Sequence, residues 1–264
     1  MARTIDLNSD LGESFGPWRM GSDEAMLSIV SSANIACGFH AGDPMTMRRT
    51  LELARKNGVG AGAHPGFNDK EGFGRRQILG LSQAEIENMI AYQVGALMGI
   101  AAHVGVPVTH VKAHGALGNM STADAAVALA VVRGVKGVDR SLPVVVMPAT
   151  VIETAAEKEG QPMMCEIFAD RAYRDDGTLM PRGQPGALIE DEAVAVPRII
   201  AMLEDGALHT VGGKRIEIPI DTICVHGDNA HAVEIARKLR SGIEAAGWRV
   251  ESFAKRSAAA RSAA

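Results

Sequence analysis

The chain has 264 residues, of which 47% are hydrophobic and 22% are charged, and its formal net charge is −4. A nucleic-acid surface is disfavoured, because it needs clustered basic charge or aromatic stacking platforms, and only 4% of the residues are aromatic. No basic-then-apolar leader is visible, and no apolar run approaches the ~20 residues that cross a bilayer. The three cysteines have no short C-x-x-C spacing, which indicates free thiols in a reducing cytoplasm. We therefore expect a cytoplasmic protein with no membrane or nucleic-acid partner.

Strand-like runs alternate with helical stretches along the chain. The predicted strands are residues 4–8, 32–39, 59–64, 109–114, 144–147, 164–169 and 222–226. Such alternation indicates a parallel α/β sheet. Seven units without a Gly-rich dinucleotide loop after the first strand favour closure into a (β/α) barrel. We expect one barrel domain over residues 1–253 and a disordered C-terminal tail over residues 254–264, which lack a large apolar side chain to bury.

Several helix boundaries carry recognisable signals. Asp43 before Pro44 predicts an N-cap, and the spacings from Ser82 to Glu85 and from Thr150 to Glu153 predict capping boxes. Glycines that favour the end of a helix are Gly58, Gly105, Gly160 and Gly247. Pro197 predicts a kink or a break in its helix.

Two insertions interrupt the strand–helix alternation late in the chain. Residues 209–220 (HTVGGKRIEIPI) predict a hairpin that turns at Gly212 and Gly213. Residues 175–186 (DDGTLMPRGQPG) predict a long mobile loop after the sixth strand.

Polar residues recur on one face of the predicted strands, because side chains alternate across a strand. The residues that share the polar faces, or follow them at the strand ends, are Asp6, Asn8, Asp10, Asn34, His40, His64, His110, Lys112, His114, Glu166, Asp170, Cys224, His226 and Asp228. In a barrel these faces point inward and rise to the C-terminal mouth, where such enzymes react. We also expect the glycines on the inner faces of the second and third strands to leave room for a ligand.

A purely structural explanation is that each polar group is a satisfied core residue, such as Lys112 paired with Asp6 or Glu166. For five histidines at one rim we prefer a functional cleft. Burying so many polar groups without a use costs about 1–3 kcal/mol for each group left unpaired.

The sequence leaves two kinds of chemistry open at this mouth. A divalent metal could be held by Asp10, His40 or His64, His114 and Asp228, although no H-x-x-x-H or H-E-x-x-H spacing specifies zinc. Acid–base catalysis is the other interpretation, because crowded acids and histidines shift one another's pKa values.

The arginines and cysteines also have two interpretations each. Arg75 and Arg76 could clamp a carboxylate or phosphate, or lie solvated on the surface, and Arg171 could pair with Asp170 or hold substrate. Cys37 is expected to pack against helices, whereas Cys224 faces inward near His226 and could act as a thiolate. The chain contains no G-x-x-x-x-G-K-[ST] phosphate loop and no G-x-S-x-G elbow.

Several long motifs are recognisable from residue 4 to about residue 250. They are DLNSDLGESFG (6–16), ANIACGFHAGDP (33–44), GAHPG (62–66), GFGRR (72–76), VKAHGALGN (111–119), EIFADRAY (166–173) and CVHGDN (224–229). Together these motifs resemble the LamB/YcsF family, whose members are known as the A component of ATP-hydrolysing 5-oxoprolinase.

The resemblance implies a TIM-like barrel of seven parallel strands, of the glycoside hydrolase/deacetylase type. It also implies conversion of 5-oxoproline, ATP and water to glutamate, ADP and phosphate, with ATP bound together with Mg²⁺. Two companion subunits, B and C, which resemble urea-amidolyase and carboxylase-type proteins, are implied as partners. One departure is clear: the family reads V-K-P-H-G-A-L-Y-N where this chain has Ala113 and Gly118.

We expect a general base among Asp10, Glu13 and Asp170, with His64, His114 and His226 orienting substrate and stabilising negative charge. The predicted substrate-binding residues are Asn8, His40, Asp43, Arg75, Arg76, Lys112, Glu166, Arg171 and Asp228. Two alternatives stay open: a stand-alone metal-dependent amidohydrolase or deacetylase, and a non-catalytic binding subunit of the complex.

Overall fold

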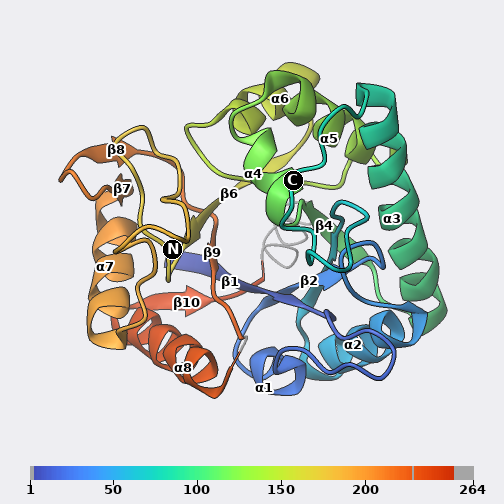
Figure 1. Ribbon diagram of the computed structural model, residues 1–264. Helices are drawn as coiled ribbons and strands as arrows, with labels where there is room; N and C mark the ends of the chain where they lie inside the picture. Colours follow the sequence, from blue (N-terminus) through green and yellow to red (C-terminus); the bar gives the residue numbers. More distant parts are fainter. Residues whose placement is uncertain (1–2, 228, 253–264) are drawn as a thin grey trace, which may run out of the picture.

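Seven parallel strands close into a barrel in the computed structural model, which describes residues 3–227 and 229–252 (Figure 1). The barrel strands are β1 (Arg3–Leu11), β2 (Ser32–Ala36), β3 (Gly60–His64), β4 (Val108–Lys112), β5 (Val144–Val146), β6 (Met163–Phe168) and β9 (Thr222–Cys224). Each strand pairs with the next along the barrel, and β9 pairs with β1 to close the ring. The predicted seven-stranded (β/α) barrel is confirmed.

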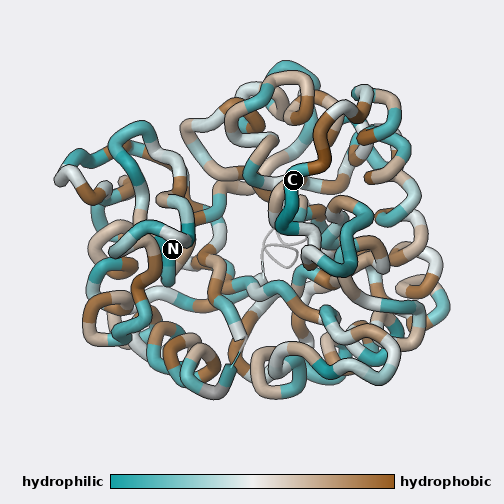
Figure 2. Tube along the Cα trace, viewed as in Figure 1, coloured by the Kyte–Doolittle hydropathy of each residue, from teal (hydrophilic) through white to brown (hydrophobic). Residues whose placement is uncertain are grey.

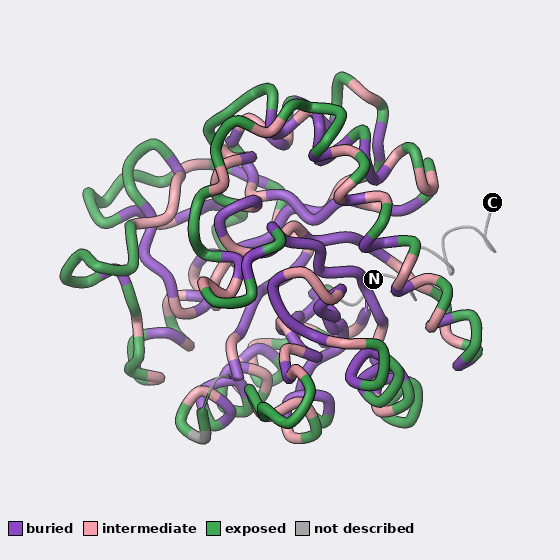
Figure 3. The backbone as a smooth tube through the Cα atoms, turned by 45° about the vertical axis from the view of Figure 1, so that its right-hand side comes forward, coloured by how far each residue is buried: buried purple, intermediate pink, exposed green. Residues whose placement is uncertain are grey.

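Helices surround the barrel in the same rotational order (Figure 1). They are α1 (Asp23–Leu27), α2 (Pro44–Asn57), α3 (Gln83–Val104), α4 (Gly115–Ser121), α5 (Ala125–Val138), α6 (Val151–Glu159), α7 (Glu192–Asp205) and α8 (Ala230–Ala245). Along these helices the hydropathy alternates between apolar and polar (Figure 2), as expected where one face packs on the strands. Buried segments fill the middle of the molecule and exposed segments lie at its edge (Figure 3).

No single described helix is long and apolar enough to cross a bilayer. Helices α4 and α5, bent by 115°, satisfy the length and composition criteria only as a pair. Apolar residues of both helices belong to the hydrophobic core.

Local sequence signals explain most of the helix ends. Asp43 accepts hydrogen bonds from the backbone N–H groups of Met45 and Thr46 at 2.9 Å, so the predicted cap of α2 is confirmed. The capping box of α3 is also present. The box predicted at Thr150 is wrong: its hydroxyl donates to Met147, and Glu153 accepts from Ala149. Ala149 has a left-handed φ of 59°, and the carboxylate of Glu153 caps this N–H instead.

Several predicted boundaries differ from the structure. Strand β2 ends at Ala36 rather than residue 39, because the chain turns through Gly38 at a φ of 94°. Strand β4 ends at Lys112, and His114 becomes the N-cap residue of α4. Helix α7 continues unbroken through Pro197, so a break there is excluded. Its buried residues on either side, Ala195 and Ile199, hold it on the barrel despite the missing backbone donor.

The hairpin and the loop near the sixth strand lie outside the barrel. Strands β7 (Ala207–His209) and β8 (Arg215–Glu217) pair antiparallel, which confirms the hairpin with a start two residues earlier than predicted. Residues 175–186 form a loop as predicted, and isolated bridges at Arg171↔Leu188 and Tyr173↔Leu179 fold it back on itself.

One strand is absent from the predicted set. Strand β10 (Trp248–Val250) pairs in parallel with the first residues of β1. The Ser252 hydroxyl then lies 3.2 Å from that of Ser32 beneath the barrel. The predicted tail, residues 254–264, lies outside the described residues.

Candidate functional site

The lower part of the barrel interior holds a set of mutually bonded polar side chains, which we call the interior network. Its members are Asn8, Asn34, His110, Lys112 and Glu166. Lys112 Nζ lies 2.8 Å from Glu166 and 3.1 Å from Asp10. Asn34 donates to Asn8 at 2.7 Å, and Asn8 donates to Glu166 at 2.9 Å. The ring of His110 reaches Asn34 at 2.7 Å. The structural pairing of Lys112 with Glu166 that the sequence left open is therefore present.

Gly60 and Gly62 on the inner face of β3 make room for this part of the interior, not for a ligand, whereas Gly38 of the predicted second strand lies beyond the end of β2. A Cβ atom at Gly62 would lie 2.1 Å from His110 Nε2, and one at Gly60 would lie 2.6 Å from Ser252 Oγ. The expectation that these glycines leave space for a ligand is wrong, because other side chains already fill that space.

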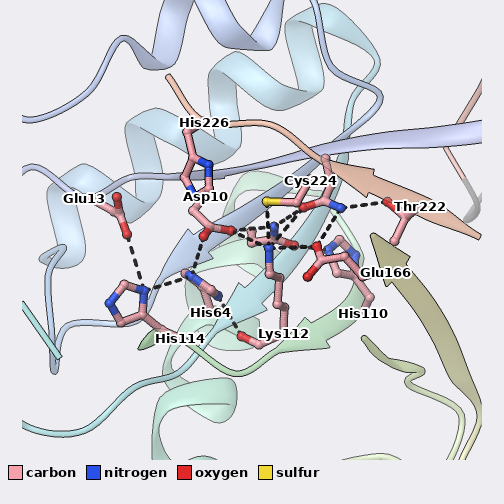
Figure 4. A network of polar contacts seen from close by, with 12 residues as sticks. Asp10, Glu13, His64, His110, Lys112, His114, Glu166, Thr222, Cys224 and His226 are labelled. Atoms are coloured by element: carbon pink, nitrogen blue, oxygen red, sulfur yellow. Dashed lines mark hydrogen bonds and ion pairs between the residues drawn. The ribbon is translucent and has the colours of Figure 1, made fainter. Parts of the chain in front are cut away.

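A second group, which we call the histidine cluster, lies at the C-terminal mouth (Figure 4). Its members are Glu13, His40, His64 and His114, whose potential ligand atoms all lie within 4.8 Å of one another. His64 ends β3 and His114 follows β4, whereas Glu13 and His40 come from the loops after β1 and β2. The three histidines are 1–4% exposed, so the cluster is almost completely buried.

Ring nitrogens and a carboxylate oxygen lie close to one another within the histidine cluster. His114 Nδ1 lies 3.1 Å from His64 Nε2, and Glu13 Oε1 lies 3.4 Å from His40 Nε2 and 3.7 Å from His114 Nδ1. The rings of His40 and His114 stack with centroids 3.6 Å apart and planes within 3°. The same nitrogen, His64 Nε2, also lies 3.2 Å from Asp10. This contact joins the histidine cluster to the interior network (Figure 4).

Burial and neighbouring charges set the protonation states here. Burial, together with the nearby His64, lowers the pKa of His114 to about 3. Burial and the neighbouring rings also hold the pKa of His40 well below its usual range. Burial alone would raise the pKa of Asp10, but the attraction of His64 and Lys112 holds it well below its usual range. The mouth therefore combines an ionised carboxylate with neutral imidazoles.

Asp170 and His226 form a separate pair at the ends of β6 and β9. Asp170 Oδ2 lies 2.7 Å from His226 Nδ1. Burial disfavours both charges, yet their mutual attraction lowers the pKa of Asp170 and raises that of His226. Both groups are therefore stabilised in their charged forms. The functional atoms of Asp10, Cys224 and His226 lie within 4.8 Å of one another, so this pair adjoins the mouth.

Two adjacent arginines have different positions. Arg76 pairs with Asp69 and Glu71, and its side chain is 61% exposed, so it is not brought into the mouth. Arg75 lies with its guanidinium carbon 5.0 Å from the centroid of the Phe73 ring. That ring lies edge-on to His114 at 5.2 Å, which places Arg75 at the rim of the histidine cluster.

The remaining predicted residues are placed as follows. Arg171 is buried and donates to the carbonyl of Met180 at 2.6 Å. Asp43 is occupied as the cap of α2 and also accepts from the N–H of Gly16. Asn8, Lys112 and Glu166 lie below the mouth in the interior network. Asp228 lies outside the described residues.

The two cysteines considered in the sequence analysis are both buried. Burial raises the pKa of Cys37 to about 12, consistent with the predicted packing role. Cys224 faces inward as predicted, 3.2 Å from Lys112 Nζ. Burial raises its pKa well above the usual range despite the attraction of Lys112, which disfavours a thiolate nucleophile there.

The loop after β3 contributes contacts that the sequence analysis missed. The carbonyl of Phe73 bonds His114 Nε2 at 2.8 Å. A Cβ atom at Gly74 would lie 2.7 Å from His40 Cβ and 2.8 Å from His114 Cδ2. The Gly-Phe-Gly run was the available signal, because two glycines so close together indicate a tight approach of backbone to other groups.

Comparisons with known proteins agree with this architecture. The model of the LamB/YcsF family matches residues 5–258, so the chain belongs to this family. It is 53% identical over 251 residues to the second 5-oxoprolinase A component of Bradyrhizobium diazoefficiens, covering 95% of this chain and 98% of that protein. It is also 53% identical to the 5-oxoprolinase A component of Rhodopseudomonas palustris strain BisB18, with the same coverage.

A solved structure extends the agreement to the fold. The crystal structure of a lactam utilization protein from Thermus thermophilus is 42% identical and superposes with a TM-score of 0.90. The match covers 95% of this chain and 100% of that one.

Proposed function

We propose that this chain is the subunit of an ATP-dependent 5-oxoprolinase that carries the lactam-opening site. One observation carries the proposal. Asp10, His64 and His114 converge at the barrel mouth, in a chain about half identical to proteins named as the A component of 5-oxoprolinase. The name of the Thermus lactam utilization protein supports the same substrate class.

The chemistry of the substrate explains the need for ATP. A five-membered lactam is an unreactive amide, and its formation from glutamate is downhill. Transfer of the γ-phosphoryl group to the lactam oxygen makes that oxygen a leaving group. Water then adds to the activated carbon, the C–N bond breaks as the ring nitrogen takes a proton, and a second water hydrolyses the resulting acyl phosphate to glutamate and phosphate. Since the sequence has no Walker-type phosphate loop, we assign ATP and its Mg²⁺ to a companion subunit, with the activated lactam bound here.

Among the candidate acids and bases, the Asp170–His226 pair fits proton transfer best. Although burial lowers it, the attraction of Asp170 raises the pKa of His226 above its ordinary value, so the imidazole holds a proton that it can donate. His226 can donate this proton to the ring nitrogen of the lactam as the C–N bond breaks. Asp10 is bonded to Lys112 and Asn34 and contacts His64, so we assign it to positioning the cluster.

The two departures from the family motif contact each other beside His114. A Cβ atom at Gly118 would lie 2.6 Å from the carbonyl oxygen of Ala113. The tyrosine that the family carries at this position would therefore require the 113–118 segment to shift. We propose that Ala113 and Gly118 adjust which small lactam is preferred.

The test is release of glutamate from 5-oxoproline, measured with this protein alone and with its two companion subunits, each with and without ATP. We expect glutamate only from the complete mixture with ATP, matched by phosphate. His226→Ala should abolish it, whereas His103→Ala, an exposed histidine on α3, should not. Absence of glutamate from every mixture would refute the proposal.

A second function is favoured by the histidine cluster alone. Three imidazoles and a carboxylate also suit a metal-dependent amidohydrolase that needs no ATP. Hydrolysis of a lactam or acetamide without ATP, abolished by a chelator, would support this alternative over 5-oxoprolinase.

A further inference from the structure

The two imidazoles at the centre of the histidine cluster present unprotonated nitrogens to each other. His64 Nδ1 lies 2.7 Å from the carbonyl of Lys112, and His114 Nε2 lies 2.8 Å from the carbonyl of Phe73. A carbonyl can only accept, so each of these nitrogens carries the ring proton. In neutral rings the opposite nitrogens, His64 Nε2 and His114 Nδ1, then both bear lone pairs, and they lie 3.1 Å apart. Two lone pairs at that distance repel unless a cation lies between or beside them.

The ring of His40 gives a second observation. Neither ring nitrogen of His40 has a hydrogen bond among the described residues, although the side chain is 1% exposed. The Glu13 carboxylate approaches this ring at 3.4 Å and His114 at 3.7 Å, beyond good hydrogen-bond distance for charged groups. Burying these ring nitrogens without a hydrogen bond is unfavourable unless a ligand of the cluster bonds to them.

The spacings match those around a single metal ion. Two ligand atoms bound at ~2.1 Å to a tetrahedral ion lie about 3.4 Å apart. In the cluster, the distance from His64 Nε2 to His114 Nδ1 is 3.1 Å, and that from Glu13 Oε1 to His114 Nδ1 is 3.7 Å. Both histidines also donate their other N–H to a backbone carbonyl, the arrangement that fixes metal-binding histidines in the required tautomer.

A shared proton is the competing explanation. If His64 were doubly protonated, its Nε2–H could point to Asp10 at 3.2 Å or to His114. That proton would satisfy His64 but would leave both ring nitrogens of His40 without a hydrogen bond among the described residues. One divalent ion accounts for the convergence of all these atoms, so the geometry favours the ion.

We propose that the histidine cluster is a binding site for a divalent transition-metal ion, held by His64 Nε2, His114 Nδ1 and the Glu13 carboxylate. His40 stacks parallel to His114, and one ion cannot lie in both ring planes. We therefore place His40 beside the ion, where it can bond to a further ligand.

The ligand types determine the class of ion. Two imidazoles and one carboxylate suit zinc, cobalt, nickel or iron(II) better than magnesium or calcium, which prefer oxygen ligands. Three protein ligands leave a position for water or substrate. When bound, such an ion polarises a carbonyl or acidifies a bound water.

The test is metal binding by the full-length chain, without any assay of turnover. The protein is stripped with a chelator, dialysed against Zn²⁺ or Co²⁺, and analysed for metal content, and the visible absorption of the Co²⁺ form is recorded. We expect one equivalent of tightly bound metal, Co²⁺ bands of low coordination number, and a rise in melting temperature. Loss of an outer-shell partner typically weakens metal binding about 10- to 100-fold, so His114→Ala and Glu13→Gln should weaken it by at least about 100-fold.

The variants also separate a built site from adventitious binding. His103→Ala is the matched control, because His103 is an exposed histidine that should bind no structural ion. Glu13→Gln keeps the size of the side chain, so it tests the carboxylate even where His114→Ala lowers stability. Binding of less than a tenth of an equivalent, or equal binding by wild type and both variants, would overturn the proposal. Neither outcome depends on whether the protein opens a lactam.

Discussion

The interior network and the histidine cluster both bury histidine and glutamate side chains but differ in how completely these are hydrogen-bonded. In the interior network, Lys112 is placed between Glu166 and Asp10, and the asparagines bond to one another. In the histidine cluster, carboxylate and imidazole atoms converge at 3.1–3.7 Å, and neither ring nitrogen of His40 forms a hydrogen bond among the described residues. Complete bonding indicates a structural role, and convergence without it indicates a place for a ligand.

His110 and His114 show why pKa alone does not separate these roles. Burial lowers the pKa of each to about 3. His110, however, bonds Asn34 and Thr109 through its two ring nitrogens, whereas His114 directs one nitrogen at His64 Nε2. The two histidines therefore differ in the partners of their ring nitrogens. Four substitutions test the corresponding difference between the interior network and the barrel mouth.

The largest expected effect is on activity at the mouth. His114→Ala should reduce turnover by the assembled enzyme by about 10³-fold, within the range for loss of a catalytic acid–base or orienting group. Its free energy of unfolding should fall by about 1–3 kcal/mol, because the buried ring stacks on His40 and bonds the carbonyl of Phe73. Denaturant unfolding and steady-state kinetics measure the two quantities. If His114→Ala keeps near-normal activity, the cluster is not the reaction site.

The second largest effect is expected on the free energy of unfolding, through loss of a charge in the interior network. Lys112→Met leaves the buried carboxylates of Asp10 and Glu166 without their cation, which should cost about 3–5 kcal/mol in free energy of unfolding. Urea titration measures this, and Lys56→Met at the exposed end of α2 is the control. A variant that unfolds normally but does not react would instead make Lys112 a substrate-contacting residue.

A smaller loss is expected where a glycine makes room for a network histidine. Gly62→Ala places a methyl group 2.1 Å from His110 Nε2, and overpacking of this kind costs about 1–3 kcal/mol. Gly99→Ala on α3, with nothing within 4 Å, should be neutral or stabilising by up to about 1 kcal/mol. Equal unfolding free energies for the two variants would show that His110 can move without cost.

Strand periodicity accounts for what could be predicted of the barrel interior. Alternation along β1 and β4 places Asp10 and Lys112 inward, and their contact follows once the barrel closes. The N-cap of α2 also follows from local chemistry, because Asp43 and Pro44 are adjacent. The first feature depends on the two-residue period of a strand and the second on adjacent residues. Both can be recognised directly in the sequence.

Features that depend on tertiary contacts could not be predicted in the same way. Glu13 and His40 belong to loops, where no period fixes the direction of a side chain, so their meeting could not be derived from spacing. The carbonyl of Phe73 that orients His114 is a backbone group, which sequence patterns do not distinguish. Strand β10 is three residues long and forms only because the start of β1 offers a free edge.

The smallest expected effect separates the two arginines that the sequence could not distinguish. Arg75→Gln should raise KM for the lactam about tenfold, because a charged hydrogen bond to the substrate carboxylate contributes roughly 1.5 kcal/mol at an exposed rim. Arg76→Gln should leave KM unchanged, since its guanidinium pairs with Asp69 on the surface. Initial rates over a range of 5-oxoproline concentrations decide between them. A raised KM in the Arg76 variant and not in the Arg75 variant would move the carboxylate-binding position from the rim of the histidine cluster to the neighbouring loop.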